Sequence, residues 1–201
     1  MIFVRVVGTS MHSLFRPCFS QYKECEGKVL SESQLQNKLR SHLAKERDLM
    51  SGQIKNPNQF YYQGMPDFIL REGQFFEPRL LPAGIDHLEI RHCYKNAFHT
   101  ALEESFVYVE GYALSASHNL PLLHAWNLDA EGFVVDRTWN PYGRVYFGAV
   151  FPLAVVPIKR GKHYPVIDDW EHGYPILRKA WDEEAARREA LDELRSLKPT
   201  G

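Results

Sequence analysis

The amino-acid sequence predicts an α+β domain in which a helix packs on an antiparallel sheet. Apolar residues follow Cys93 at helical intervals, and three β-like runs come after them, between residues 106 and 138. Amphipathic helical patterns also occur near residue 40 and after residue 175. Helices from both ends of the chain are therefore expected to cover a sheet of neighbouring strands.

Length and composition indicate one domain. The chain has 201 residues, of which 44% are hydrophobic and 13% aromatic, enough material for one core but not for two large ones. Within the single domain 1–201 we expect an N-terminal accessory part over 1–90 and a core that carries the chemistry over 91–160. A C-terminal helix is expected over 175–198.

Charge and cysteine content narrow the partners and the compartment. With 24 basic and 25 acidic side chains, the chain has no global field that would attract nucleic acid or an anionic membrane. No run approaches the roughly 20 apolar residues of a membrane-spanning helix. The first eight residues, interrupted by Arg5, are expected to form a strand and not a signal peptide. Three cysteines, a small and odd number, favour a reducing, cytoplasmic compartment.

The N-terminal elements are predicted from caps and periodicity. Residues 9–30 show no period and are expected to be loop. A helix is predicted from the caps around Ser31 to Gly52, because leucines recur at helical spacing between them (Leu35, Leu39, Leu43 and Leu49). Residues 52–66 are expected to form an ordered loop that carries an aromatic cluster. A short strand, a turn at Gly73 and a second extended piece should follow.

The central segment predicts a helix and then an antiparallel meander. Cys93 is expected to open the helix, which ends near Ser105. Three strands follow, with a tight hairpin before the last of them (Phe106–Leu114, Leu122–Leu128 and Phe133–Thr138). Residues 146–151 and 153–158 are expected to add one or two strands. The apolar stripe of the last helix should dock on the domain or, alternatively, form the contact of a homodimer.

Three residues are candidates for nucleophilic catalysis. A helix N-terminus favours the thiolate form of a cysteine, and Cys93 is predicted at such a position. An imidazole can take the thiol proton and later protonate the leaving group, while a carboxylate orients the imidazole. His124 and Asp136 lie at similar distances from the hairpin centre at Ala130 and Glu131, so strand pairing should bring them together on one face.

The sequence around these residues resembles the transglutaminase-like branch of the papain-like cysteine enzymes. The likeness covers about residues 90–140. It is carried by the helix-initial Cys93, by His-Ala-Trp at 124–126 and by Gly-Phe-Val-Val-Asp-Arg-Thr at 132–138. The resemblance implies a papain-like fold and a catalytic triad in the chain order Cys, His, Asp. The block as far as Gly148 is also similar to uncharacterised bacterial and bacteriophage proteins.

The group that would stabilise an oxyanion is less clearly marked. His92 and Tyr94 flank Cys93, whereas transglutaminase-like enzymes often have a Gly-x-Cys approach and a Trp at these places. The backbone N–H groups of Cys93 and Tyr94 are the expected donors, and the side-chain amide of Asn96 is an alternative, as are those of Gln63 and Gln74.

Two further residues are candidates for substrate binding. Glu110 lies in an otherwise apolar strand, where a charge needs a partner or a role. Trp126 lies two residues beyond His124 and is expected on the same side of its strand, where it would wall the site. Trp139 either shapes a pocket or begins a turn with Pro141.

The expected reaction is acyl transfer through a thioester on an amide or ester of a protein or small molecule. Water as acceptor would make the protein a thiol protease, amidase or deamidase, and an amine would make it a transamidase. No cofactor is implied, and no recognised zinc spacing links Cys93 with His87, His92 and His99. The alternative is a non-catalytic binding or structural protein on a degenerate papain-like fold. An arylamine-type acyltransferase is a weaker alternative, because no acyl-CoA site is recognisable.

Overall fold

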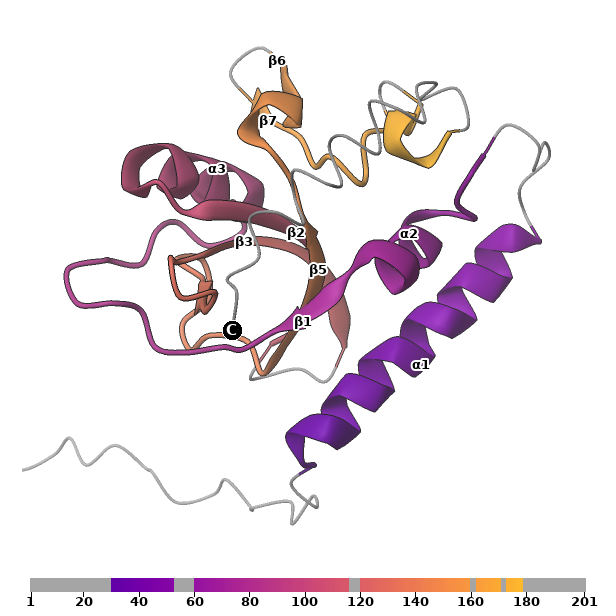
Figure 1. Cartoon of the computed structure of the whole chain (residues 1–201), viewed down its shortest axis with the longest axis horizontal. Helices are drawn as coiled ribbons and strands as arrows, with labels where there is room; N and C mark the ends of the chain where they lie inside the picture. The colour runs from indigo at the N-terminus through magenta and orange to yellow at the C-terminus, as the bar shows by residue number, and fades with distance from the viewer. Residues whose placement is uncertain (1–29, 53–59, 116–119, 160–161, 171–172, 179–201) are drawn as a thin grey trace, which may run out of the picture.

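An antiparallel sheet is the centre of the fold (Figure 1). The computed structural model describes residues 30–52, 60–115, 120–159, 162–170 and 173–178. In this part of the chain the sheet has five strands in the order β1-β5-β2-β3-β4, and every neighbouring pair is antiparallel. The strands are Gln74–Phe76 (β1), Val107–Leu114 (β2), Pro121–Leu128 (β3), Val134–Val135 (β4) and Val145–Val150 (β5). The sheet is curled and helices cover it, which confirms the predicted α+β class.

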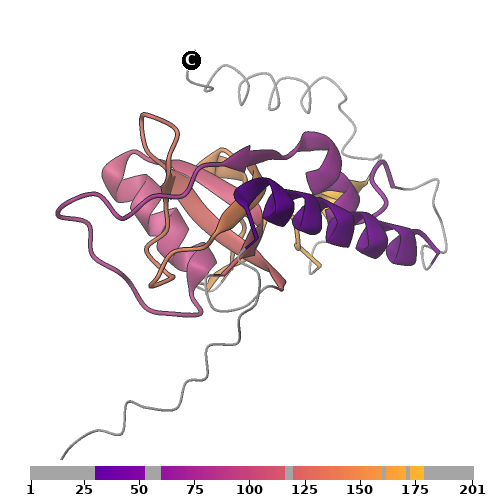
Figure 2. The same ribbon diagram turned by 90° about the horizontal axis from the view of Figure 1, so that it is seen from below.

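The α-helices of the described residues are Glu32–Ser51 (α1), Met65–Glu72 (α2) and Cys93–Glu104 (α3). Figures 1 and 2 show α3 at one flank of the sheet and α1 with α2 at the other, next to β1 and β5. Short elements follow β5, namely two 3-10 turns and a small hairpin (Leu153–Val155, η2; Ile158–Lys159, β6; Lys162–His163, β7; Pro175–Leu177, η3).

The two faces of the sheet carry different clusters of side chains. Tyr108, Tyr112 and Phe147 belong to the main hydrophobic cluster, which also contains buried residues from α1, α2 and α3. A smaller cluster covers the other face (Phe76, Val109, Ala113, Trp126 and Tyr146). Because strand residues alternate between the faces, His124, which pairs with Gly111, lies on the side of the smaller cluster.

The predicted helix near residue 40 is confirmed as α1. The Ser31 hydroxyl accepts a hydrogen bond from the backbone N–H of Gln34, and the Gln34 side chain accepts one from the backbone N–H of Ser31, which is a capping box. Three of the four predicted leucines are buried (Leu35, Leu39 and Leu43), whereas Leu49 is 69% exposed. Both α1 and β1 precede residue 90, so the N-terminal part supplies core residues and a strand of the central sheet.

The segment after Pro66 is the helix α2, where the sequence predicted a strand. Pro66 stands in the first turn, where its missing N–H costs no hydrogen bond. Asp67 accepts a hydrogen bond from the backbone N–H of Gln63 at 2.9 Å and lies 3.8 Å from Arg71, one turn later. These local contacts outweigh the β-like character of the apolar run 68–70.

The helix at Cys93 and the meander after it are confirmed, with two differences in strand length. The predicted strand 133–138 is reduced to Val134–Val135, because the chain leaves the sheet there. The predicted strand 153–158 is mostly the 3-10 turn η2, which follows Pro152. A proline cannot donate to a strand ladder, and it suits the start of a turn.

Other predicted elements lie outside the described residues. These are the strand 1–8, the loop 9–29, and the helix 175–198 beyond residue 178, together with its proposed dimer surface. Where the chain is described, none of its helices combines the length and the apolar character that crossing a bilayer requires.

Candidate cysteine–histidine–aspartate site

Cys93 is the first residue of α3. The N-cap residue, His92, makes no side-chain cap, so the first N–H groups of the helix are not covered by a capping side chain. Arg91 leads into the helix with φ at 68°, in the left-handed region that a residue other than glycine rarely adopts. The partly buried thiol packs against the main cluster. Its position is the positive end of the helix dipole.

The imidazole of His124 lies between this thiol and a carboxylate. Its Nε2 is 2.8 Å from Oδ2 of Asp136, and the two side chains are 2% and 1% exposed. Because an ionised carboxylate only accepts hydrogen bonds, Nε2 carries the proton. The Cys93 side chain lies close enough to the imidazole to raise its pKa, and Nδ1 is the ring nitrogen that Asp136 does not engage. Cys93, His124 and Asp136 therefore form a line of neighbouring side chains, with the imidazole in the middle.

The hairpin brings His124 and Asp136 together, but its strand pairing is centred slightly later in the chain than the sequence predicted. The β3–β4 pairing is centred on Glu131. Continued by one residue, this register places Asp136 beside Trp126, on the same face as His124 but not directly opposite it. Because the chain leaves the sheet after β4, the carboxylate can reach along the strand to the imidazole.

The Asp136 carboxylate is hydrogen-bonded through both oxygens. Oδ1 accepts from the backbone N–H of Thr138 at 2.9 Å and from that of Trp139 at 3.2 Å. Oδ2 accepts from His124 and from the hydroxyl of Tyr146, the latter at 2.7 Å. A carboxylate held on both sides has a fixed plane, and this fixes the direction in which it meets the imidazole.

The electrostatics of the pair favour its charged form. Burial lowers the pKa of His124, but Asp136 and the adjacent Cys93 side chain raise it more strongly, to about 9. Burial raises the pKa of Asp136, and the neighbouring His124 together with the hydrogen-bond donors lowers it below its usual value. A protonated imidazole beside Cys93 is the partner that a thiolate requires.

Two tryptophans lie beside the imidazole. The Trp139 ring stacks on His124 with ring centroids 3.9 Å apart and planes 15° apart. Trp126 lies on the predicted side of its strand, and its ring centroid is 6.2 Å from that of His124. It is 1% exposed and packs edge-on against Phe76 and Tyr146, so it supports the imidazole from beneath. The half-buried Trp139 is the ring that covers the imidazole.

The side chain of Asn96 joins the helix to the aspartate loop. Its Nδ2 donates to the carbonyl of Glu89 at 2.7 Å and to the hydroxyl of Thr138 at 3.0 Å. Both N–H groups are thereby used, which leaves no side-chain donor for an oxyanion. Gln74 is in the edge strand β1, which β5 and β2 separate from β3. Of the candidate donors, the backbone N–H groups of Cys93 and Tyr94 lie at the thiol itself.

Glu110 is buried away from solvent and holds another part of the chain. Its carboxylate accepts from the hydroxyl of Tyr108 at 2.7 Å and from the backbone N–H groups of Val166 and Ile167 at 2.8 and 3.1 Å. Burial raises the pKa of Glu110 to about 7, against the lowering effect of these donors. Burial, together with the neighbouring Glu110, also raises the pKa of Tyr94 well above its usual value. Glu110 thus anchors the segment after β7.

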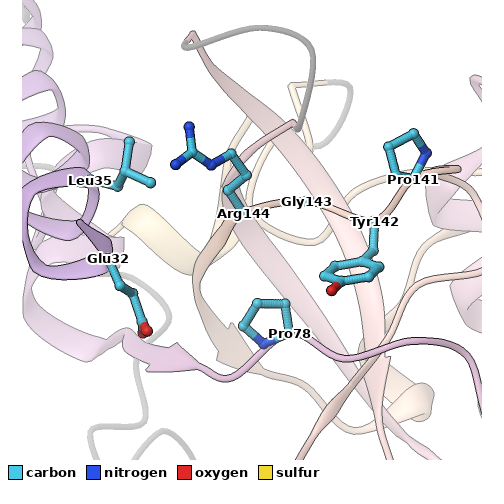
Figure 3. A pocket seen from close by; sticks show the side chains of 7 residues that line it. All are labelled: Glu32, Leu35, Pro78, Pro141, Tyr142, Gly143 and Arg144. Atoms are coloured by element: carbon cyan, nitrogen blue, oxygen red, sulfur yellow. The ribbon is translucent and has the colours of Figure 1, made fainter. Parts of the chain in front are cut away.

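A separate pocket of about 400 Å³ lies between α1 and the loop before β5 (Figure 3). Glu32 and Leu35 line it from α1, and Tyr142, Gly143 and Arg144 line it from the loop. None of the three triad residues is in its lining. Among the described residues, no group of three or more His, Cys, Asp or Glu side chains could hold a metal ion.

Sequence reasoning identified the three residues of the line but not the groups that hold them. Tyr146 and the Thr138 backbone were not singled out as partners of Asp136, and the role of Trp139 was left open between a pocket and a turn. The one available signal was the Asp-x-Thr pattern at 136–138. Comparisons of the chain with protein-family models, with curated proteins and with solved structures give no match.

Proposed function

We propose that the protein catalyses cysteine-dependent acyl transfer on an amide or ester through a thioester intermediate. The observation that carries the proposal is the Cys93–His124–Asp136 line, in which a partly buried thiol at the N-terminus of α3 lies beside a buried imidazole–carboxylate pair. A thiol, a raised-pKa imidazole and an ionised carboxylate in this order are the parts of an activated cysteine nucleophile. The substrate would be a protein or a small-molecule amide, and no cofactor is needed.

The proposed reaction begins when the sulfur of Cys93 attacks the substrate carbonyl and His124 holds the thiol proton. The carbonyl oxygen becomes an oxyanion, for which the backbone N–H groups of Cys93 and Tyr94 are the proposed donors. His124 then gives its proton to the leaving amine or alcohol, and the thioester remains. Water or a second amine attacks the thioester, His124 accepts a proton from it, and the thiol is regenerated.

The likeness of residues 90–140 to transglutaminase-like enzymes supports the same proposal. A helix that begins at Cys93 and packs on an antiparallel sheet, with the histidine on β3 and the aspartate just after β4, is compatible with the papain-like fold that the likeness implies. The proposal extends to a cytoplasmic setting, in which a free thiol is maintained in its reduced form.

The test is the rate of Cys93 alkylation by iodoacetamide as a function of pH. Cys18→Ser and Cys25→Ser provide a background in which the measured thiol is Cys93. We expect the rate to reach half its maximum well below the pH of about 8.5 that is usual for a thiol. In His124→Ala this reactivity at neutral pH should be lost, and in Asp136→Asn it should be reduced.

Two controls give the result its meaning. Far-UV circular dichroism of each variant shows whether the fold is retained, and His99→Ala removes a histidine from α3 that lies outside the line. A thiol in the native wild-type chain that reacts only above pH 8.5, or only after unfolding, would overturn the proposal. It would then favour a binding protein that retains the fold without turnover.

A further inference from the structure

Tyr146 belongs to β5 and lies entirely inside the protein, with 0% of its surface exposed. Its hydroxyl oxygen is 2.7 Å from the backbone nitrogen of Gly143 and 2.7 Å from Oδ2 of Asp136. The Gly143 N–H can only donate and the carboxylate can only accept, so the direction of both hydrogen bonds is fixed. The tyrosine proton must point at Asp136.

The hydroxyl binds the same carboxylate oxygen as the imidazole does. Oδ1 of Asp136 is held by two backbone N–H groups, whereas Oδ2 is shared between His124 Nε2 and Tyr146. Without the tyrosine hydroxyl, Oδ2 would accept a hydrogen bond only from the imidazole, among the described residues. The negative charge of the carboxylate would then be shared among fewer donors. The strength and the direction of the His124–Asp136 bond therefore depend on Tyr146.

A second feature shows that the hydroxyl is held in place and not merely accommodated. A Cβ atom added at Gly143 would lie 2.8 Å and 2.9 Å from the Cζ and hydroxyl oxygen of Tyr146, and 3.0 Å from the carbonyl of Leu114. Only glycine lets the loop backbone approach the tyrosine closely enough to donate. The loop that lines the 400 Å³ pocket thereby fixes the hydroxyl position from behind.

We infer that Tyr146 is a positioning residue of the site, which acts through Asp136 to set the orientation and hydrogen-bond strength of His124. This inference rests on the proposed function for its chemical meaning. The hydroxyl keeps the carboxylate ionised and draws part of its charge away from the imidazole. His124 can then release its proton to a leaving group more readily than it would beside an unshared carboxylate.

The experiment compares Tyr146→Phe with Tyr62→Phe in the full chain. Both variants keep the aromatic ring and remove a buried hydroxyl that donates to a carboxylate, because Tyr62 donates to Glu72 at 2.6 Å. Tyr62 lies before α2, apart from the triad. Proton NMR of the Nε2 proton of His124, assigned with His124→Ala, reports on the bond to Asp136. The pH dependence of Cys93 alkylation, in the Cys18→Ser and Cys25→Ser background, reports on the thiol.

We expect Tyr146→Phe to move the His124 proton resonance and to shift the midpoint of the Cys93 alkylation profile to lower pH by about one unit, because the imidazolium beside the thiolate then faces the undivided charge of Asp136. Tyr62→Phe should change neither. Gly143→Ala, which displaces the hydroxyl from its other side, should shift the same resonance. Equal effects of Tyr146→Phe and Tyr62→Phe on both measurements would overturn the inference.

The two proposals fail in distinguishable ways. If Cys93 of the wild type has no special reactivity, the proposed function fails, and the His124 resonance alone decides the role of Tyr146. If the wild-type thiol is reactive and Tyr146→Phe leaves both its pH profile and the resonance unchanged, the proposed function stands and Tyr146 is only a core residue.

Discussion

Glu110 shows how one residue can resist a sequence-based interpretation. A charge in an apolar strand indicated either a partner or a role in substrate binding. The structure supplies the partners, which are hydrogen-bond donors from Tyr108 and from the backbone at 166 and 167, and Glu110 is 0% exposed. Because the two backbone donors come from a segment more than fifty residues later in the chain, no local pattern could have predicted them.

The burial of Glu110 predicts a pH-dependent stability. The pKa rises from its ordinary value of 4.5 in the unfolded chain to about 7 in the fold. The folded state therefore binds the proton more tightly, and the contribution of this group to stability is lost as the pH rises from about 4.5 through 7. Glu110→Gln should remove this part of the pH dependence, on the order of 2 to 3 kcal/mol in the free energy of unfolding.

Urea denaturation of wild type and Glu110→Gln between pH 5 and 8 measures the effect, because other titrating groups cancel in the difference. The exposed Glu104→Gln serves as the matched control and should follow the wild type. Parallel stability curves for wild type and Glu110→Gln would show that Glu110 is ionised throughout and that the donors fully offset its burial.

The proximity of Cys93, His124 and Asp136 could be predicted because the signals for it are local or nearly so. Cys93 opens a periodic helix, and a single tight hairpin relates His124 to Asp136. Tyr146 and Asn96 could not be assigned in this way. Tyr146 reaches Asp136 from β5, which pairs with β2 and β1. Asn96 reaches Thr138, which lies 42 residues later in the chain. Such tertiary contacts leave no period in the sequence.

At the scale of elements, caps predicted better than runs of apolar residues did. The polar cluster at Ser31 marked the start of α1, and the structure contains the reciprocal hydrogen bonds of a capping box there. The apolar run 68–70 suggested a strand but lies in α2. The helical conformation of this run is explained by signals at the helix ends and not by periodicity. These signals are a proline in the first turn and the Asp67–Arg71 pair.

The capping box gives a prediction for α1. Ser31→Ala removes the acceptor for the backbone N–H of Gln34 and should lower the free energy of unfolding by about 1 kcal/mol. Chemical denaturation measures the change. Ser41→Ala makes the same substitution at an exposed mid-helix position, where alanine is the better helix former, and should be neutral or slightly stabilising. Equal effects of the two substitutions would argue against a contribution from the cap.

At the scale of the whole molecule, the core extends across residue 90. Leucines of α1, the tyrosines of β2 and Phe147 of β5 belong to one cluster, and β1 forms the edge of the central sheet next to β5. From length and apolar content the sequence indicated enough material for one core. It could not predict how closely the accessory part joins the core, because the contacts between them are long-range.

This continuity predicts that damage to α1 destabilises the distant site. Leu39 is 0% exposed, so Leu39→Ala should cost about 2 to 5 kcal/mol. Leu49→Ala on the same helix should cost less than about 0.5 kcal/mol, because Leu49 is 69% exposed. Trp126 and Trp139 lie beside His124, so their fluorescence reports unfolding at the site. A separate transition for α1, with the tryptophan signal unchanged, would show that the two parts unfold independently.

The pairing of β1 with β5 also has a consequence for synthesis on the ribosome. Gln74 pairs with Gly148, and the chain between them must be made before the two strands can meet. At translation rates of about 5 to 20 residues per second, this interval lasts about 4 to 15 s. Throughout it, the apolar faces of α1 and α2 are without the strand that later covers them. The apolar surface that β5 later covers therefore stays exposed until that strand emerges.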